Sequence, residues 1–219
     1  MDQLTFKFPF SKKYYEQDYF VSSNNFSAYK LIDGWPNWPG KCLNIFGESG
    51  CGKTHLSKIL EKKIKKTKLI EAKNINDELI SNLNIFECLI IDNFDNNIEE
   101  ELFYSTLNQC KFFDIFVLIN SKNSLKKNNF YLKDLKSRIN SFVFIGIELP
   151  TDDLLKVIIT KFLSDKQIKI NSKLVDFIIN NVERSYKKMF KFLKELDELS
   201  LSTGKSININ LIKKVLEHE

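Results

Sequence analysis

The chain has 219 residues, which is enough for one substantial hydrophobic core and a small second domain. Hydrophobic residues make up 43% of it and aromatic residues 13%, a composition that excludes an intrinsically disordered protein. The formal net charge of +5 comes almost wholly from lysine in a sequence rich in asparagine and isoleucine, so the charge alone is weak evidence for nucleic-acid binding.

The start of the chain carries charges without an apolar segment behind them, and no later stretch holds 18 apolar residues in a row. We therefore expect a cytoplasmic protein that has no membrane partner. The four cysteines lie at irregular spacings without a C-x-x-C pair, and the chain has only two histidines. This pattern argues against structural zinc and against a disulfide framework.

The first elements are short. Residues 1–10 read as an extended segment in which apolar and polar residues alternate up to Pro9. Such a segment forms either an edge strand or a peptide for another protein's groove. Residues 22–25 offer N-cap side chains for a helix through Ile32, and the prolines and glycine within residues 35–40 predict a turn.

Five apolar runs predict strands. Residues 42–46 lead directly into a glycine-rich loop, after which apolar residues recur at helical spacing. The other four runs alternate with polar or helical segments, as the βαβ units of a parallel sheet require. They lie at residues 68–71, 88–91, 115–119 and 142–147. The pattern predicts an α/β domain with a five-stranded parallel sheet flanked by helices.

The strand pattern ends at residues 149–152, and the remainder of the chain is helical by its period. This tail is predicted to be a small all-helical lid. The predicted organisation is an N-terminal peptide at residues 1–10, an α/β domain at residues 11–150 and the lid at residues 151–219.

The glycine-rich loop carries the strongest chemical signal. Its sequence, Gly-Glu-Ser-Gly-Cys-Gly-Lys-Thr at residues 47–54, matches G-x-x-x-x-G-K-[ST] between a predicted strand and a predicted helix. In such a P-loop, backbone N–H groups surround phosphate oxygens, Lys53 reaches the terminal phosphates and the Thr54 hydroxyl coordinates Mg²⁺. The alternative is a glycine turn that binds nothing. We expect ATP or ADP with Mg²⁺, held by Gly47, Gly50, Cys51, Gly52, Lys53, Thr54 and His55.

Asp92 ends the apolar run at residues 89–91, where a carboxylate that holds Mg²⁺ belongs in such sites. The alternative is an ordinary turn former. Many hydrolysing P-loop proteins have a second acid next, but this chain has Asn93, whose amide can position water and cannot take its proton. Asp95 is a possible substitute that would face differently if the strand continues. Whether the chain hydrolyses ATP by itself is therefore left open.

Asn120 and Ser121 follow the fourth predicted strand and are candidates for sensing a γ-phosphate, with a simple turn as the alternative.

The chain has only two arginines among its 33 basic residues. Where lysine is the default cation, an arginine indicates a site that needs a planar, bidentate group, although chance placement is the alternative. Arg138 precedes the fifth predicted strand, a place from which an arginine finger projects from one subunit toward the next subunit's nucleotide. Arg184 opens a predicted lid helix and could contact the phosphates, and Lys187 competes for that role. For either arginine the alternative is a surface salt bridge.

With these motifs in place, the chain resembles the DnaA-like family of AAA+ replication proteins along nearly its whole length, and most closely the short Hda-type members. The resemblance is carried by residues 18–21 with Ser23 and Asn24, and by residues 47–54, 89–92, 135–138 and 183–185. It implies a P-loop AAA+ domain followed by the lid, with Phe20 and Val21 lining the adenine.

Two features favour the Hda type. The sequence stops after the lid, without room for the helix-turn-helix domain of the initiator DnaA. The segment Gln3 to Phe8 also resembles the family's sliding-clamp-binding peptide, in which glutamine enters a polar notch and apolar side chains fill a pocket. The expected contacts are Gln3, Leu4, Phe6 and Phe8. An ordinary edge strand is the alternative.

The resemblance implies a regulator of replication initiation. Bound to the sliding clamp, the β subunit of DNA polymerase III, and holding ADP, it would dock beside ATP-loaded DnaA. Arg138 would then stimulate hydrolysis by DnaA and so inactivate it, with DNA contacted only through the clamp. Contacts through Arg138 also allow a homo-oligomer.

Two other functions compete. A helicase loader or replication-initiation adaptor of the same AAA+ type would bind a helicase in place of the clamp through its N-terminal segment. A small-molecule kinase shares the P-loop, but such enzymes commonly place several arginines around the phosphates, and this chain has two well-separated ones.

Overall fold

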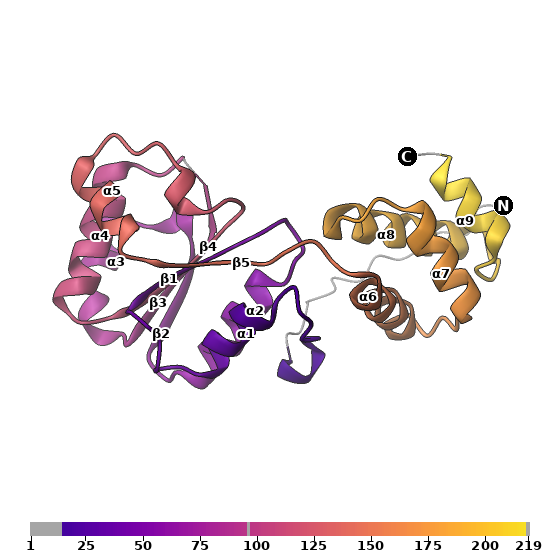
Figure 1. Cartoon of the computed structure of the whole chain (residues 1–219), viewed down its shortest axis with the longest axis horizontal. Helices are drawn as coiled ribbons and strands as arrows, with labels where there is room; N and C mark the ends of the chain where they lie inside the picture. The colour runs from indigo at the N-terminus through magenta and orange to yellow at the C-terminus, as the bar shows by residue number, and fades with distance from the viewer. Residues whose placement is uncertain (1–14, 96, 218–219) are drawn as a thin grey trace. The chain divides into compact units, whose positions relative to one another are not determined.

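The computed structural model describes residues 15–95 and 97–217. The chain divides into two compact units, whose described parts are residues 15–148 and residues 149–217 (Figure 1). The Gln3 to Phe8 segment lies outside the described residues, so the assigned clamp peptide stays a prediction.

The larger unit is built on a five-stranded parallel sheet with the strand order β2-β3-β4-β1-β5. Its strands are β1 (Cys42–Phe46), β2 (Thr67–Glu71), β3 (Cys88–Phe94), β4 (Phe116–Ser121) and β5 (Val143–Gly146). The predicted five-stranded parallel sheet is confirmed. β1 and β4, distant in sequence, are neighbours, so the loop after β1 and the residues that end β3 and β4 meet at the carboxyl edge of the sheet.

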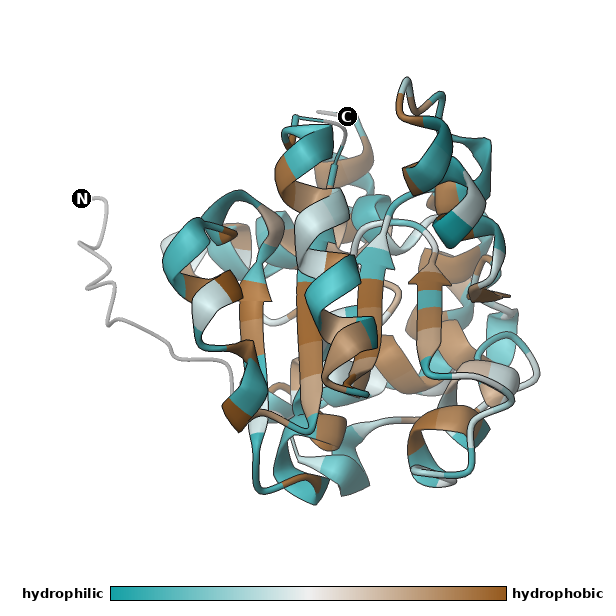
Figure 2. Cartoon of the chain, turned by 90° about the vertical axis from the view of Figure 1, so that its left-hand side faces the viewer, coloured by the Kyte–Doolittle hydropathy of each residue, from teal (hydrophilic) through white to brown (hydrophobic). Residues whose placement is uncertain are grey.

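Helices cover both faces of this sheet (Figure 1). α1 (Phe26–Asp33) and α2 (Lys53–Lys63) lie on one face, and α3 (Asp77–Ser81), α4 (Glu100–Phe112) and α5 (Lys133–Asn140) lie on the other. Four short 3₁₀ segments also occur in the described part of this unit: Glu16–Asp18, Ala72–Asn74, Leu83–Ile85 and Leu125–Lys127. Because both faces are covered, the central strands are apolar runs without alternation, and Figure 2 shows them as a mostly hydrophobic layer.

β3 runs further than predicted. The apolar run suggested that the strand ends at Asp92, but it continues through Asn93 to Phe94, so that prediction is wrong. Asn93 adopts φ 53°, which asparagine tolerates better than most residues, and the pairing with β4 shifts register between Ile91 and Phe94. The shift returns the Phe94 side chain to the core, where it packs against Phe103 with ring centroids 4.8 Å apart.

The smaller unit contains four helices within its described residues: α6 (Asp152–Asp165), α7 (Ser172–Asn181), α8 (Tyr186–Thr203) and α9 (Ile209–Leu216). The predicted helical C-terminal region is confirmed. Each helix begins after a polar residue whose side chain accepts a hydrogen bond from the backbone N–H three residues on. These N-caps are Thr151, Asn171, Ser185 and Asn208.

The smaller unit has a hydrophobic core of its own, which is mostly aliphatic. Its fully buried members include Ile159, Ile178, Phe192 and Ile212, which come from all four helices. In the part of the chain that the structure describes, no helix is long and apolar enough to span a bilayer.

Candidate functional site

The loop between β1 and α2 forms a tight cradle that requires glycine. At Gly47, a Cβ would lie 2.9 Å from the Ile147 carbonyl oxygen. Gly52 has φ 99° and packs so closely on the Tyr19 ring that a Cβ would lie 2.9 Å from a ring carbon. α2 begins at Lys53, directly after Gly52, so its free N–H groups and the positive end of its dipole face the loop, as an anion requires. Gly50, also at positive φ, and the buried Cys51 complete the turn.

Lys53 points into this loop. Its ammonium donates to the carbonyl oxygens of Gly47 at 2.6 Å and Glu48 at 2.9 Å. The Cys51 sulfur lies 3.6 Å from the same nitrogen. Burial raises the pKa of the Cys51 thiol, and the neighbouring Lys53 charge opposes that rise. The cation predicted to meet phosphate is thus held inside the cradle by backbone oxygens that a phosphate group can replace.

Thr54, Asp92 and Asn120 converge from α2, β3 and β4. The Thr54 hydroxyl donates to Asp92 Oδ2 at 2.8 Å, and Asn120 Nδ2 donates to Asp92 Oδ1 at 2.9 Å and to Ser57 Oγ at 2.7 Å. Asp92 is 4% exposed and Asn120 is fully buried. Hydroxyl and carboxylate oxygens side by side are the donors that Mg²⁺ prefers, so these residues fit a magnesium ion.

The orientation of the Asn120 amide follows from its partner. A carboxylate only accepts hydrogen bonds, so the amide must turn its nitrogen to Asp92. Asn120 Oδ1 is then buried without a hydrogen-bond donor among the described residues. Such an acceptor suits a water molecule or a ligand donor. Ser121, the other candidate at this strand end, donates to the Asn123 carbonyl at 2.6 Å and accepts from Asn44 at 2.9 Å, which is a structural role in the turn.

Aromatic residues lie beside the cradle. Tyr19 contacts Gly52, stacks on Tyr29 at 5.9 Å and meets the His55 ring edge-on at 5.3 Å. Phe20 is 44% exposed, its carbonyl accepts from the Asn25 amide at 2.9 Å, and Val21 is half-buried. The sequence interpretation chose Phe20 and Val21 and passed over Tyr19, although the close approach at Gly52 places the Tyr19 ring directly against the loop.

Asn93 and Asp95 are the two candidates for activating water. Asn93 lies exposed on β3, immediately after Asp92. The Asp95 carboxylate accepts from the backbone N–H and the side-chain amide of Asn97, both at 3.1 Å. Asp95 is therefore engaged in its own turn, which does not favour it as the substitute acid.

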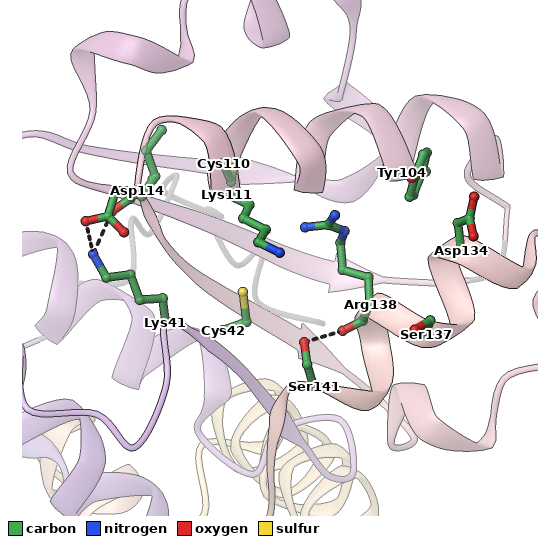
Figure 3. Close-up of a pocket in the computed structure, with 11 residues that line it drawn as sticks. Lys41, Cys42, Tyr104, Cys110, Lys111, Asp114, Asp134, Ser137, Arg138 and Ser141 are labelled. Carbon is green, nitrogen blue, oxygen red and sulfur yellow. Dashed lines mark hydrogen bonds and ion pairs between the residues drawn. The ribbon is translucent and has the colours of Figure 1, made fainter.

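Arg138 lies in the last turn of α5, half-buried, with its guanidinium 5.8 Å from the Tyr104 ring centroid. It lines a pocket with Cys42, the first residue of β1 (Figure 3). The P-loop follows Phe46, the last residue of β1, so the length of the strand, about 13 Å at roughly 3.3 Å per residue, separates the two regions. Arg138 is thus not part of this chain's own cradle.

Arg184 and Lys187 lie in the smaller unit. Arg184 was predicted to open a lid helix, but α8 begins at Tyr186 and Arg184 stands in the preceding loop. Its Nη2 atom lies 3.0 Å from Asp152 Oδ1 and donates to Oδ2 at 3.1 Å, an exposed ion pair of small energetic value. Lys187 is the second residue of α8 and is exposed. The choice between them as lid sensor stays open.

Comparison with known proteins gives two family matches. A family model described as "Hda, lid domain" matches residues 157–216, within the smaller unit. A model described as "RNA helicase" matches residues 43–139, which contain the P-loop, Asp92 and Arg138.

Relatives and solved structures agree with the lid match. The chromosomal replication initiator protein DnaA of Buchnera aphidicola subsp. Cinara cedri is 24% identical over 242 residues, covering 94% of this chain and 53% of DnaA, so the chain spans about half of that relative. Domain III of Thermotoga maritima DnaA has a TM-score of 0.75 at 18% identity, covering 96% of this chain and 98% of that one. AMPPCP-bound DnaA from Aquifex aeolicus has a TM-score of 0.67 at 18% identity, covering 86% and 66%. At these identities the solved structures establish the fold.

Proposed function

Because the chain belongs to the DnaA-like AAA+ family and carries an Hda-type lid, we propose that it is a nucleotide-binding regulator that inactivates the initiator DnaA. In this proposal the protein binds the sliding clamp, docks beside ATP-loaded DnaA and stimulates ATP hydrolysis by DnaA through Arg138. The observation that carries the proposal is the position of Arg138, at the opposite end of β1 from this chain's own P-loop.

Nucleotide binding is the first part of the proposal. The cradle offers the α2 N-terminus and the Lys53 ammonium to phosphate, and a DnaA of the same fold binds AMPPCP. Thr54 and Asp92 would hold Mg²⁺, which neutralises phosphate charge when bound. Asn120 orients the Asp92 carboxylate and, among the described residues, keeps an acceptor without a donor beside it.

The residue after Asp92 supports a protein that holds nucleotide more than it hydrolyses it. Asn93 offers an amide, which cannot take a proton from water, and Asp95 is bound to Asn97. A slowly hydrolysing module keeps one nucleotide state for long periods, and that suits a regulatory subunit. We therefore infer that the protein keeps its bound nucleotide, ADP or ATP, while it docks.

The stimulating step is assigned to Arg138. A planar guanidinium that binds two phosphate oxygens at once stabilises the charge that develops on a transferring phosphoryl group, and a finger supplied in trans raises hydrolysis about a thousandfold or more. Because Arg138 lies about one strand length from its own cradle, the nucleotide it serves belongs to another molecule. The N-terminal residues Gln3, Leu4, Phe6 and Phe8 are assigned to the clamp.

The test measures ATP hydrolysis by DnaA with DNA-loaded clamp and the purified protein. Wild type is expected to stimulate, and Arg138→Ala is expected to lose the stimulation while still binding the clamp. Lys136→Ala, which removes an exposed cation from the same helix, is the matched control and should stimulate normally. A Gln3→Ala, Leu4→Ala, Phe6→Ala variant should lose clamp binding.

Two results would contradict the proposal. Full stimulation by Arg138→Ala would remove the arginine finger from the mechanism. Failure of the wild-type protein to bind the clamp would remove the peptide assignment and bring the helicase-loader alternative forward, to be checked by binding to the replicative helicase.

A further inference from the structure

A pocket of about 630 Å³ opens at the amino-terminal end of β1 (Figure 3). Its lining comes from three parts of the larger unit: the start of β1, α4 with the turn after it, and α5. Arg138 lines this pocket, so the other lining residues determine which ligand Arg138 can bind.

Some of the charged side chains in this pocket form ion pairs among the described residues, and others do not. Lys41 forms an ion pair with Asp114 and also donates to the Asp114 carbonyl at 3.0 Å, so these two charges neutralise one another. Two cations remain, Lys111 from α4 and Arg138 from α5. Within residues 15–95 and 97–217, neither side chain forms an ion pair with a carboxylate.

The two cations face each other. Figure 3 shows the Lys111 amine and the Arg138 guanidinium pointing toward the same part of the pocket, while the Asp134 carboxylate lies on the other side of Arg138. Like charges that converge without a counter-ion repel each other, and an anion between them removes that repulsion.

The Arg138 Nε–H also lacks an acceptor in the part of the chain that the structure describes. This nitrogen is buried, while the Tyr104 ring, 5.8 Å away, supports the guanidinium. The Cys42 thiol marks the same positive region: burial raises its pKa to about 11, and the charges of Arg138 and Lys111 oppose that rise. A phosphate oxygen is the acceptor that such a fork binds best.

Two exposed aromatic residues lie in sequence between Lys111 and Asp114, which both line the pocket. Phe112 is 79% exposed and Phe113 is 39% exposed, directly after Lys111, with ring centroids 5.0 Å apart. Large exposed aromatic side chains are typical of protein contact sites. These aromatic side chains therefore favour a protein partner, and we expect that partner to hold the anion that binds in the pocket.

We propose that Lys111 and Arg138 together form a two-cation receptor for the terminal phosphate of a nucleotide held by an adjoining DnaA-like module. This rests on the proposed function and adds Lys111 to it: Arg138 grips two oxygens as a fork, and Lys111 supplies a point charge from the opposite wall. In the hydrolysis that they assist, water bonds to the γ-phosphorus as the bond to the bridging oxygen breaks. The products are ADP and inorganic phosphate, and a proton is released to solvent.

The first test compares Lys111→Met, Lys111→Arg and Lys65→Met in the DnaA hydrolysis assay. Lys111→Met is expected to lower the maximal stimulated rate at least about tenfold, with the half-saturating protein concentration unchanged, because a phosphate contact is lost and docking is kept. Lys111→Arg should restore most of the rate. Lys65, exposed in the turn after α2, is the matched control and should leave the rate unchanged.

The outcomes separate the two proposals. Wild-type rates in Lys111→Met, with stimulation lost in Arg138→Ala, would overturn the receptor and leave the arginine finger intact. No stimulation by the wild-type protein would overturn the proposed function and the receptor with it.

A second test identifies the source of the phosphate. The chain has only two arginines, so two arginine Nε–H signals are expected in a ¹⁵N spectrum, and Arg184→Lys assigns the one from Arg138. Titrated with inorganic phosphate, the isolated protein should show no saturation of the Arg138 shift below about 1 mM, since the partner's aromatic contacts and positioning are missing. Saturation below that concentration would assign the pocket to a free anion and overturn a partner-held nucleotide.

Discussion

Thr54 Oγ1 donates a hydrogen bond to Asp92 Oδ2 at 2.8 Å, which joins the first turn of α2 to β3 across the carboxyl edge of the sheet. If this pair holds Mg²⁺, removal of the hydroxyl has a specific effect. Thr54→Val is expected to weaken ATP binding about tenfold in Mg²⁺ and to leave binding in EDTA nearly unchanged. Thr54→Ser keeps the oxygen and should behave as wild type. Calorimetric titration with and without Mg²⁺ measures this, and a Thr54→Val protein that still responds to Mg²⁺ would exclude the hydroxyl as a ligand.

The P-loop was predictable because its residues act locally. The strand, the glycines and the helix start are adjacent in sequence, so the local sequence determines the conformation of the loop. The parallel sheet was predictable because five apolar runs alternate with helical segments. The continuation of β3 was not, because a polar Asp92 and Asn93 interrupt the apolar run, and the register shift that returns Phe94 to the core depends on pairing with a distant strand.

The pocket around Arg138 also depends on contacts between residues that are distant in sequence, which could not be predicted. Arg138 itself was predicted from its rarity and its place before β5. Lys111 was not, because a lysine on an exposed helix end has no distinguishing pattern in a lysine-rich chain, and only the packing of α4 beside α5 brings it near Arg138. Tyr19 was missed for a similar reason, since its contact with Gly52 joins residues 33 positions apart.

Asn93 gives the second prediction. It follows Asp92 on β3 at φ 53°, a conformation that aspartate and glycine also tolerate, so both replacements should fold normally. Asn93→Asp is expected to raise the ATP hydrolysis rate of the isolated protein about tenfold or more, because a carboxylate can take a proton from water. Asn93→Gly is the control for the backbone and should not raise it. Phosphate release measured at saturating ATP tests this, and equal rates for all three proteins would mean that the missing acid does not limit hydrolysis.

The third prediction concerns the stability contribution of Asn44. This fully buried β1 residue donates to the Ile119 carbonyl and to Ser121 Oγ, both at 2.9 Å, and accepts from the Leu125 N–H at 3.0 Å. Asn44→Leu removes all three bonds and leaves buried polar groups without partners. We expect a loss of about 2–4 kcal/mol in the free energy of unfolding.

Urea denaturation of the full chain measures this loss. Asn181→Ala removes an exposed amide that bonds the Phe177 carbonyl, and it should change stability by less than about 0.5 kcal/mol. A stability change for Asn44→Leu as small as that of the exposed control would contradict a structural role for the buried amide.

Two buried thiols give the last prediction. Burial raises the pKa of Cys88 and of Cys110 from 9.0 to about 12, and both side chains are essentially inaccessible. Below pH 9 both thiols keep their protons in the folded and the unfolded chain, so their contribution to stability is constant. Between about pH 9 and 12 the unfolded chain loses protons that the folded chain keeps, so stability falls by up to roughly 1.4 kcal/mol per pH unit for each thiol.

The measurement compares urea denaturation of the wild type with a Cys88→Ala, Cys110→Ala variant at pH 8, 9 and 10. Because lysine and tyrosine residues titrate in both proteins, the difference between the two curves isolates the thiols. The wild type should lose stability faster than the variant above pH 9, while below pH 9 their difference should stay constant and reflect only the lost packing volume. Parallel curves up to pH 10 would mean that the folded chain can ionise these thiols as readily as the unfolded one, through an opening of the sheet edge where β3 begins.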